Sequence, residues 1–454
     1  MSGALALTEG KIGKLLVRFS LPFLLSSMIQ TAYSSVDIFF LGRFASAQAQ
    51  AGAGNGAALL FTVTGFFLGL TNGGMILLGQ YFGARRDRDA AKATGNIAAV
   101  LIVSAAAASA IVFLFGRTFL NIMNVPGEAA GEAWDYLRIC ACGLLFTMGY
   151  AAVSSVLRAL GNSKAPLVFV SISCGINIVL DYIFVGPLGM GAAGAAAATV
   201  IAQCFSLIVS VAFLAIKRLP FRFGLRDIKP DFAVIKSIFR LGLPISLQTV
   251  LNMLSFVVIA GIINKLGVPA SAANGVVNNL ANFYMTVPMA IGTALSAISA
   301  QNLGAGKPYR ALAAAKMGSL FSLAVAVPCV LFANFRPEAI VSLLSDDPEV
   351  IAESARFLIP FSWDCLFVSF VFCLNGFFNG CGITAFVAAH ELVAAFAVRI
   401  PLSWLLSRAP GATLFHVGIG TPAATAASLA MCLAFYKLRM SGGRLESLKI
   451  AYGE

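Results

Sequence analysis

The stretch GQYFGA at residues 79–84 recurs as AQNLGA at residues 300–305. Two other landmarks recur at the same spacing: Leu-Pro at 21–22 and 243–244, and the turn GNS at 161–163, which returns as GIT at 382–384. The offsets are 222, 221 and 221 residues (244 − 22, 304 − 83 and 382 − 161). A nearly constant offset across three landmarks predicts a chain built from two similar halves.

The composition indicates a membrane protein. Of the 454 residues, 59% are hydrophobic and 11% are charged, whereas a soluble domain carries about 25% charged residues. A spanning helix needs about 20 apolar residues, and twelve segments meet that need. They lie at 16–42, 54–79, 93–116, 133–157, 165–186, 191–216, 235–264, 271–299, 311–335, 352–379, 384–407 and 412–436. We therefore expect an all-α polytopic membrane protein with two pseudo-symmetric bundles of six helices.

The basic residues predict the orientation of the chain. With the N-terminus inside, 23 of the 31 lysines and arginines fall in cytoplasmic segments and 5 in outer loops. This bias follows the positive-inside rule and places both termini in the cytoplasm, so the net charge of +12 does not indicate nucleic-acid binding. We expect a first lobe at 1–216, a basic cytoplasmic linker at 217–234 and a second lobe at 235–454. Six helices per half make the repeats parallel, and such halves are typical of transporters.

The nine cysteines lie in apolar segments, without a CxxC pair or a His/Cys cluster. We expect free thiols that behave as small hydrophobic groups, and no cofactor.

Polar residues inside spanning segments are the best candidates for a functional site, because they are costly there. By topology, Asp37, Tyr136, Asn177, Asp181 and Thr199 share one depth in the outer half of the first lobe. Asn177 and Asp181 are four residues apart and so share a helix face. Two carboxylates, an amide and two hydroxyls form a hard oxygen-donor set that suits a proton or Na⁺.

Two other interpretations of these residues remain open. Asp37 could lie at the outer interface and pair with Arg43. The five residues could also be scattered caps at the interface, with no shared site.

The second lobe offers different polar residues. Asp364 lies in segment 352–379, and His390, Glu391 and Arg399 lie in segment 384–407. A structural ion pair of Arg399 with Glu391 or Asp364 is an alternative to a substrate contact, and His390 alone is more typical of a packed histidine. Pro401 predicts a kink that frees backbone carbonyls.

Taken together, these residues resemble the MATE family of multidrug and toxic compound extrusion transporters over nearly the whole chain. The matching pieces are Pro22, Gln30-Thr31, Val36-Asp37 and Gly42; GQ at 79–80 and GA at 83–84; LRALGNSK at 157–164; Asn177 and Leu180-Asp181; LGMG at 188–191 and GA at 194–195; QNLGAG at 301–306; and RIPL at 399–402. The resemblance implies a V of two six-helix bundles that exports a substrate against inward flow of H⁺ or Na⁺. It implies a cation site at Asp37, Tyr136, Asn177, Asp181 and Thr199.

The chain departs from one branch of that family. NorM-like members carry acids at the positions of Asn252 and Val368, and Asp364 lies one turn from the second position. The resemblance is therefore closer to the prokaryotic DinF-like branch, with coupling through the first lobe. We expect substrate contacts at Gln30, Tyr33, Asn252, Asp364, Glu391 and Arg399.

The duplication does not repeat the polar groups of the first half. The counterparts of the five site residues are, in the same order, Ile259, Phe357, Val398, Leu402 and Gly420. We therefore expect two halves that are alike in fold and unlike in function.

The expected function is a monomeric antiporter of the inner membrane that exports organic cations or drugs. A flippase for a lipid-linked saccharide is the alternative, although it would usually need a more cationic cavity. A membrane enzyme would need a motif such as HExxH, and the sequence has only two histidines. A passive channel would not need carboxylates buried in one lobe.

Overall fold

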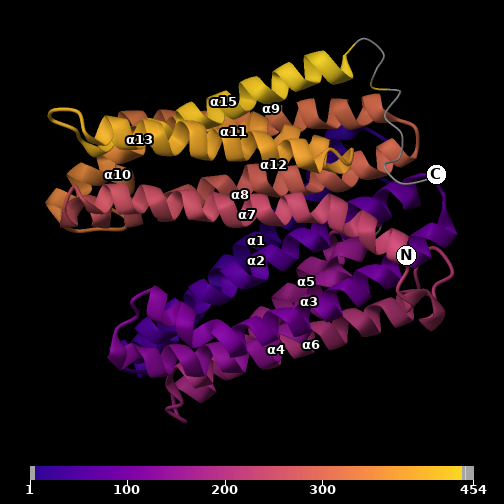
Figure 1. The fold of residues 1–454 in the computed structure, drawn as a ribbon, viewed down its shortest axis with the longest axis horizontal. Helices are drawn as coiled ribbons and strands as arrows, with labels where there is room; N and C mark the ends of the chain where they lie inside the picture. Colours follow the sequence, from indigo (N-terminus) through magenta and orange to yellow (C-terminus); the bar gives the residue numbers. More distant parts are fainter. Residues whose placement is uncertain (1–5, 442–444, 446–454) are drawn as a thin grey trace. The chain divides into compact units, whose positions relative to one another are not determined.

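The computed structural model describes residues 6–441 and residue 445. Every regular element of this part of the chain is helical, and twelve segments are long and apolar enough to cross a membrane. The expected all-α polytopic class is confirmed (Figure 1). The spans of the first half are α1 (Ile12–Phe44), α2 (Ala47–Gly83), α3 (Asp87–Ile122), α4 (Gly127–Ala159), α5 (Lys164–Val185) and α6 (Gly191–Lys217).

The second half holds six further spans, together with several short helices. A 3-10 turn, η1 (Leu225–Ile228), precedes α7 (Phe232–Asn264), α8 (Val268–Gly304), α9 (Pro308–Phe335), α10 (Pro337–Val341) and α11 (Pro348–Gly380). The last two spans are interrupted: α12 (Thr384–Val393), η2 (Ala394–Arg399) and α13 (Ile400–Ser407), then α14 (Leu414–Gly418), α15 (Gly420–Phe435) and η3 (Tyr436–Met440).

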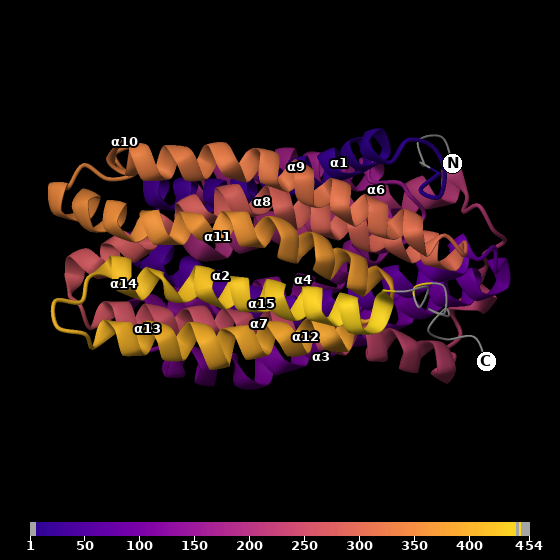
Figure 2. The ribbon, with the colours of Figure 1, turned by 90° about the horizontal axis from the view of Figure 1, so that it is seen from above.

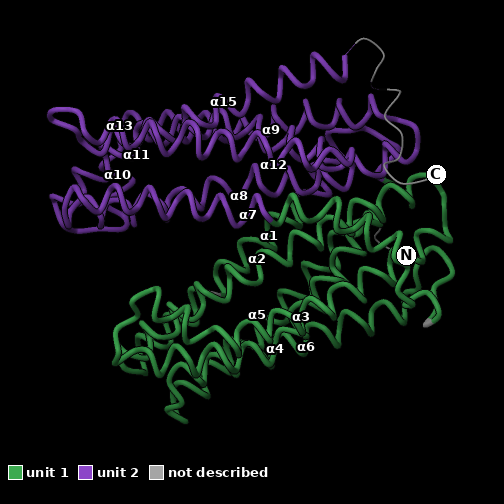
Figure 3. Tube along the Cα trace, viewed as in Figure 1, with its two compact units in different colours: residues 1–6, 21–246 green, residues 7–20, 247–454 purple. Residues whose placement is uncertain are grey.

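The chain forms two compact units (Figure 3). Unit 1 contains Leu21–Ser246, and unit 2 contains Leu7–Ser20 and the chain from Leu247 onward. Two helices therefore contribute to both units. α1 changes unit next to Pro22 and α7 changes unit close to Pro244. The repeated Leu-Pro landmark therefore lies close to the point where each helix passes from one unit to the other. Each proline also removes one backbone N–H from its helix.

Small residues set the helix packing of unit 1. α4 packs along α2, α3 and α6. A Cβ on Gly52 of α2 would meet the backbone of Ala129 and Ala133 on α4, so that glycine is needed where the two helices touch. Ala192 and its neighbouring alanines on α6 are fully buried in the same core. Close backbone approach of this kind is typical of helices in membranes.

Unit 2 is organised around α11, which packs along α8, α9 and α15. Gly292 on α8 and Gly376 and Gly380 on α11 lie where the two backbones approach most closely. Phe377 and Phe378 of α11 are fully buried in a hydrophobic core that also holds residues of α8, α9, α12 and α15.

The eleventh span contains a π-helical segment, Ala394–Arg399, directly before Pro401. The expected irregularity at Pro401 thus takes the form of a widened helical turn, because proline has no N–H for the carbonyl four residues earlier. Figure 2 shows α12 and α13 continuing along one line with α15 beside them. The widened turn packs against α15 and carries Arg399 at its end.

Candidate functional sites

In unit 1, a polar cluster joins three helices. Thr199 on α6 donates a hydrogen bond of 3.4 Å from Oγ1 to Oδ2 of Asp37 on α1. Asn177 and Asp181 on α5 are the other side-chain neighbours of the Asp37 carboxylate. Asn177 and Asp181 are fully buried, and Asp37 is 8% exposed. Four of the five predicted ion-site residues therefore lie together in the core of unit 1.

Most polar atoms of this cluster lack a hydrogen-bond partner. Oδ1 of Asp37, both polar side-chain atoms of Asn177 and both carboxylate oxygens of Asp181 are buried without one among the described residues. Asn177 and Asp181 thus face Asp37 without hydrogen bonds of ordinary geometry to it. A buried polar atom without a partner costs about 1–3 kcal/mol, and more when it is charged. Oxygens gathered in this way fit a proton or Na⁺ bound among them.

Two tyrosines flank the cluster. Tyr136 on α4 is 6% exposed and lies within electrostatic range of Asp37 and Tyr33. Tyr33 on α1, which the sequence placed among the substrate contacts, lies beside the polar cluster, with its hydroxyl 3.5 Å from the Thr199 carbonyl oxygen. Gln30 is an exposed side chain of α1.

The alternative readings of this cluster do not match the geometry. Asp37 is buried and forms no ion pair with Arg43 in the described part of the chain. The residues also converge from α1, α5 and α6, so they are not scattered caps.

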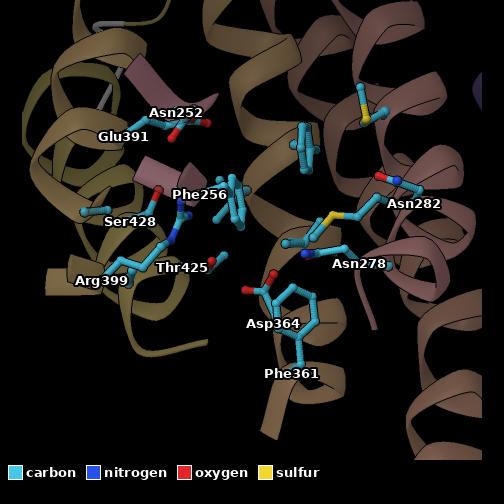
Figure 4. A pocket seen from close by; sticks show the side chains of 18 residues that line it. Asn252, Phe256, Asn278, Asn282, Phe361, Asp364, Glu391, Arg399, Thr425 and Ser428 are labelled. Carbon is cyan, nitrogen blue, oxygen red and sulfur yellow. The ribbon is translucent and has the colours of Figure 1, made fainter. Parts of the chain in front are cut away.

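Unit 2 contains a cavity of about 460 Å³ between α7, α8, α11, α12, η2 and α15. Figure 4 shows its polar side chains entering from these helices. Its wall includes Asn252, Asp364, Glu391 and Arg399, four of the six predicted substrate contacts. Aromatic and methionine side chains, among them Phe256, form much of the rest.

Amide groups hold the Glu391 carboxylate. Asn252 Nδ2 donates to Oε2 at 2.6 Å, and Asn375 Nδ2 donates to Oε1 at 2.5 Å. The other end of the Asn375 amide, Oδ1, lies 3.0 Å from Nε2 of His390. Because Asn375 gives its N–H to the carboxylate, its oxygen must accept from His390, which places the ring proton on Nε2. Ser428 Oγ then donates to Nδ1 of His390 at 2.9 Å.

His390 is buried, as expected of a packed histidine, and it is also part of this hydrogen-bonded chain. The sequence interpretation overlooked Asn375 and Ser428, which make this chain. Each is a polar residue within an apolar segment, which is the feature that could have identified it. The sequence could not show their hydrogen-bond partners, because those partners lie on other helices.

Arg399 projects from the end of η2 over the ring of Phe256, with its guanidinium carbon 4.6 Å from the ring centre. Its Nη1 donates a 3.4 Å hydrogen bond to Ser255 Oγ, and its Nε has no hydrogen-bond partner among the residues that the structure describes. Asp364 and Glu391 lie within electrostatic range, but the described residues include no ion pair between Arg399 and either acid. The direct pair that the sequence left open is not formed.

The sequence matches one protein family twice. The MatE family model matches residues 22–183 and 244–405, more than half of the chain. The two matches begin at the positions of the two repeated prolines.

Curated relatives agree with this match. The chain is 28% identical to the probable multidrug resistance protein YpnP of Bacillus subtilis, over 98% of each chain. It is 26% identical to the probable multidrug resistance protein YoeA of the same organism, over 92% of each chain.

Solved structures show the same fold. An outward-facing multidrug resistance MATE family transporter superposes with a TM-score of 0.89, at 19% identity over 99% of both chains. A MATE structure in the bent conformation gives a TM-score of 0.90, at 19% identity over 97% of both chains. With twelve apolar spans and a family model matched in both halves, the chain is a multi-pass membrane protein that belongs to the MATE family of multidrug transporters.

Proposed function

We propose that this protein is an antiporter that exports bulky amphipathic, mostly cationic compounds in exchange for inward flow of H⁺ or Na⁺. The observation that supports ion coupling is a set of five buried polar atoms on Asp37, Asn177 and Asp181 that have no hydrogen-bond partner among the described residues. Two carboxylates buried side by side are costly unless a cation lies with them. A site of this kind has a strong affinity for a proton or a small metal ion.

The cation acts on the packing of three helices. Its arrival reduces the net negative charge shared by Asp37 and Asp181 and draws α1, α5 and α6 together around Thr199. Loss of the cation leaves the carboxylates to repel each other, which favours a different packing of the same helices. An ion can shift this balance only through a difference in its affinity for the two arrangements. Alternating access then follows from the two arrangements of unit 1.

Further features support a first-lobe mechanism of the DinF-like type. Asn252 and Val368 stand where NorM-like members carry acids, and Asn252 is bonded to Glu391. The counterparts of Asp37 and Tyr136, Ile259 and Phe357, belong to one hydrophobic core cluster of unit 2. We therefore assign ion coupling to the first lobe, residues 1–216, and substrate contacts in part to the second, residues 235–454, with the basic stretch 217–234 as their linker.

We place the protein in a bacterial or archaeal inner membrane, and the distribution of basic residues supports an orientation with both termini in the cytoplasm. The protein would act as a monomer, without an enzymatic step and without a cofactor other than its coupling ion. A lipid-linked saccharide flippase is less favoured, because Arg399 is the only cation among the residues that line the unit 2 cavity.

The test is transport in proteoliposomes with a panel of cationic dyes and imposed gradients. A pH gradient or a Na⁺ gradient should each be applied alone, with the other ion equal on both sides. Accumulation of dye driven by one of the two gradients supports an antiporter and identifies the ion. Dye movement that follows only its own concentration gradient would mean a passive pathway.

A further inference from the structure

A row of polar side chains continues from the polar cluster of unit 1 along α5 and α6. On α5, Ser173 lies one turn from Asn177. On α6, Gln203 and Ser206 lie one and two turns from Thr199. Spacings of three, four and seven residues place each set on one helix face. The row runs toward the lysine-bearing ends of the two helices, which the distribution of basic residues assigns to the cytoplasm.

Contacts near both ends fix how α5 lies against α6. A Cβ on Gly194, near the start of α6, would lie 3.2 Å from the backbone of Phe184, near the end of α5. Near the other end of the pair, the rings of Phe169 on α5 and Phe213 on α6 pack edge to face with their centres 5.5 Å apart. The two helices are therefore antiparallel neighbours along their length.

This antiparallel register brings the polar residues of the two helices to matching depths. Between the two contacts, Asn177 falls at the level of Gln203, and Ser173 falls at the level of Ser206. The second level lies about one helical turn further from the cluster than the first. Oxygen atoms from both helices therefore follow one another along the interior of unit 1.

The oxygens of this row are not used by the protein. Ser173 and Ser206 are each 1% exposed, and neither their Oγ atoms nor Oε1 of Gln203 has a hydrogen-bond partner in the described part of the chain. A helical serine can donate to the carbonyl four residues earlier, as Ser171 does to Leu167 at 2.9 Å. Because a buried oxygen without a partner is costly, these three oxygens indicate a ligand that the protein itself does not supply.

Close helix packing alone does not account for the row. Small side chains let helices approach each other in a membrane, but alanine does so without burying an oxygen. The second half of the chain uses alanine here, because the counterparts of Ser173, Gln203 and Ser206 at the offset of 221 are Ala394, Ala424 and Ala427. The polar row is thus replaced in the second half, together with the residues of the cluster.

Apolar side chains close the inner end of the row. Phe169 and Phe213 belong to one hydrophobic cluster with Tyr150, Leu157 and Val170. Hydrophobic constrictions of this kind stop ions by excluding water.

We propose that the coupling ion leaves the polar cluster along this row, with Gln203, Ser173 and Ser206 as successive oxygen ligands and the pair Phe169 and Phe213 as the inner gate. Amide and hydroxyl oxygens suit a small hard cation such as Na⁺, and buried polar residues in spanning helices mark ion pathways and proton relays. The inward direction of flow rests on the proposed function, but the existence of the path does not.

The first experiment separates ion release from ion binding. Dye accumulation in proteoliposomes is measured against the concentration of the driving ion, for the unsubstituted protein and for the double variant Ser173→Ala with Ser206→Ala. One hydrogen bond is worth roughly a factor of two to ten, so loss of two ligands should lower the maximal rate about tenfold. The ion concentration that gives half of the maximal rate should stay unchanged, because the polar cluster is intact. A packing role would leave both quantities unchanged, since alanine is smaller than serine.

The matched control replaces two serines that the protein does use. Ser155 on α4 and Ser171 on α5 each donate at 2.9 Å to a carbonyl oxygen of their own helix. The double variant Ser155→Ala with Ser171→Ala should keep the maximal rate of the unsubstituted protein. Thermal unfolding confirms that every variant is folded before transport is measured.

The second experiment opens the inner gate and uses no dye substrate. Proteoliposomes that contain a pH-sensitive or a Na⁺-sensitive fluorophore are placed in a gradient of that ion alone. Phe213→Ala should show a steady ion leak that the unsubstituted protein lacks, and adding Ser173→Ala and Ser206→Ala should lower this leak about tenfold. The control is Phe119→Ala, which removes one ring of the pair Phe115 and Phe119 on α3 and should show no leak.

Three results would overturn the inference: an unchanged maximal rate in the serine variant, no leak through Phe213→Ala, or a leak that keeps its full size when both serines are replaced. Failure of the proposed antiport would be seen differently, because the unsubstituted protein would then accumulate no dye under either gradient. The leak measurement would still test the path in that case.

Discussion

Thr199 on α6 donates its hydroxyl hydrogen to the carboxylate of Asp37 on α1, with 3.4 Å between Oγ1 and Oδ2. Their counterparts in the second half of the chain are Gly420 and Ile259. Neither of those residues can make the bond, and Ile259 lies in a hydrophobic core. The same scaffold therefore holds a polar cluster in one unit and apolar packing in the other.

The Thr199 hydroxyl should contribute to ion affinity without being needed for folding. Thr199→Val keeps the shape of the side chain and removes the donor to Asp37. We expect the apparent affinity for the coupling ion to fall by about tenfold or more, since a hydrogen bond to a charged group contributes about 1.5–3 kcal/mol and about 1.4 kcal/mol corresponds to a factor of ten. This affinity is measured from the dependence of dye transport on the concentration of the coupling ion. Thr199→Ser should behave as the original protein, and an equal loss in the serine variant would contradict the role of the hydroxyl.

Two buried asparagines should respond in opposite ways to the same substitution. Within the described part of the chain, both polar side-chain atoms of Asn177 lack a hydrogen-bond partner, whereas those of Asn375 are bonded to Glu391 and His390. Asn177→Leu removes unsatisfied groups and should leave the thermal stability of the ion-free protein unchanged or raised, while transport falls. Asn375→Leu strands two polar partners and should destabilise the protein by about 1–3 kcal/mol for each.

The test compares the thermal unfolding temperatures of both variants with that of the unsubstituted protein, in detergent at one pH and without Na⁺. Clear destabilisation by Asn177→Leu would mean that the amide is structurally bonded in unit 1. That result would remove the main support for an ion site there.

Close helix packing in unit 2 should depend on individual glycines. A Cβ on Gly380 of α11 would lie 2.5 Å from the carbonyl oxygen of Ser296 on α8. Gly380→Ala should therefore lower stability by about 1–3 kcal/mol through overpacking. Gly175 on α5 has open space around its Cβ position, so Gly175→Ala should be neutral or raise stability by up to about 1 kcal/mol. Thermal melting curves of the two variants test these expectations. Similar shifts in melting temperature for Gly380→Ala and Gly175→Ala would contradict the packing argument.

The sequence predicted the spans well because each needs only a long apolar run, which is a local property. It also brought four polar residues of unit 1 to a common depth from topology alone. It did not predict that a π-helical turn would precede Pro401. The N–H that proline lacks shows which backbone hydrogen bond is lost, but it does not show how the preceding turn rearranges. It missed Asn375, whose partners Glu391 and His390 lie on a neighbouring helix. The placement of Tyr33 beside Thr199 likewise depends on packing between helices rather than on either segment.

The central claim is that Asp37 carries the coupling ion, and ion-driven transport by Asp37→Asn tests it most directly. Asp135→Asn is the matched control, since Asp135 lies next to Tyr136 on α4 but forms an exposed ion pair with Arg138. Both variants and the unsubstituted protein are reconstituted at equal density, and dye accumulation is measured under the driving gradient. We predict that Asp135→Asn accumulates dye as the unsubstituted protein does, while Asp37→Asn remains folded and inserted and shows no gradient-driven accumulation. Undiminished accumulation by Asp37→Asn would contradict the account.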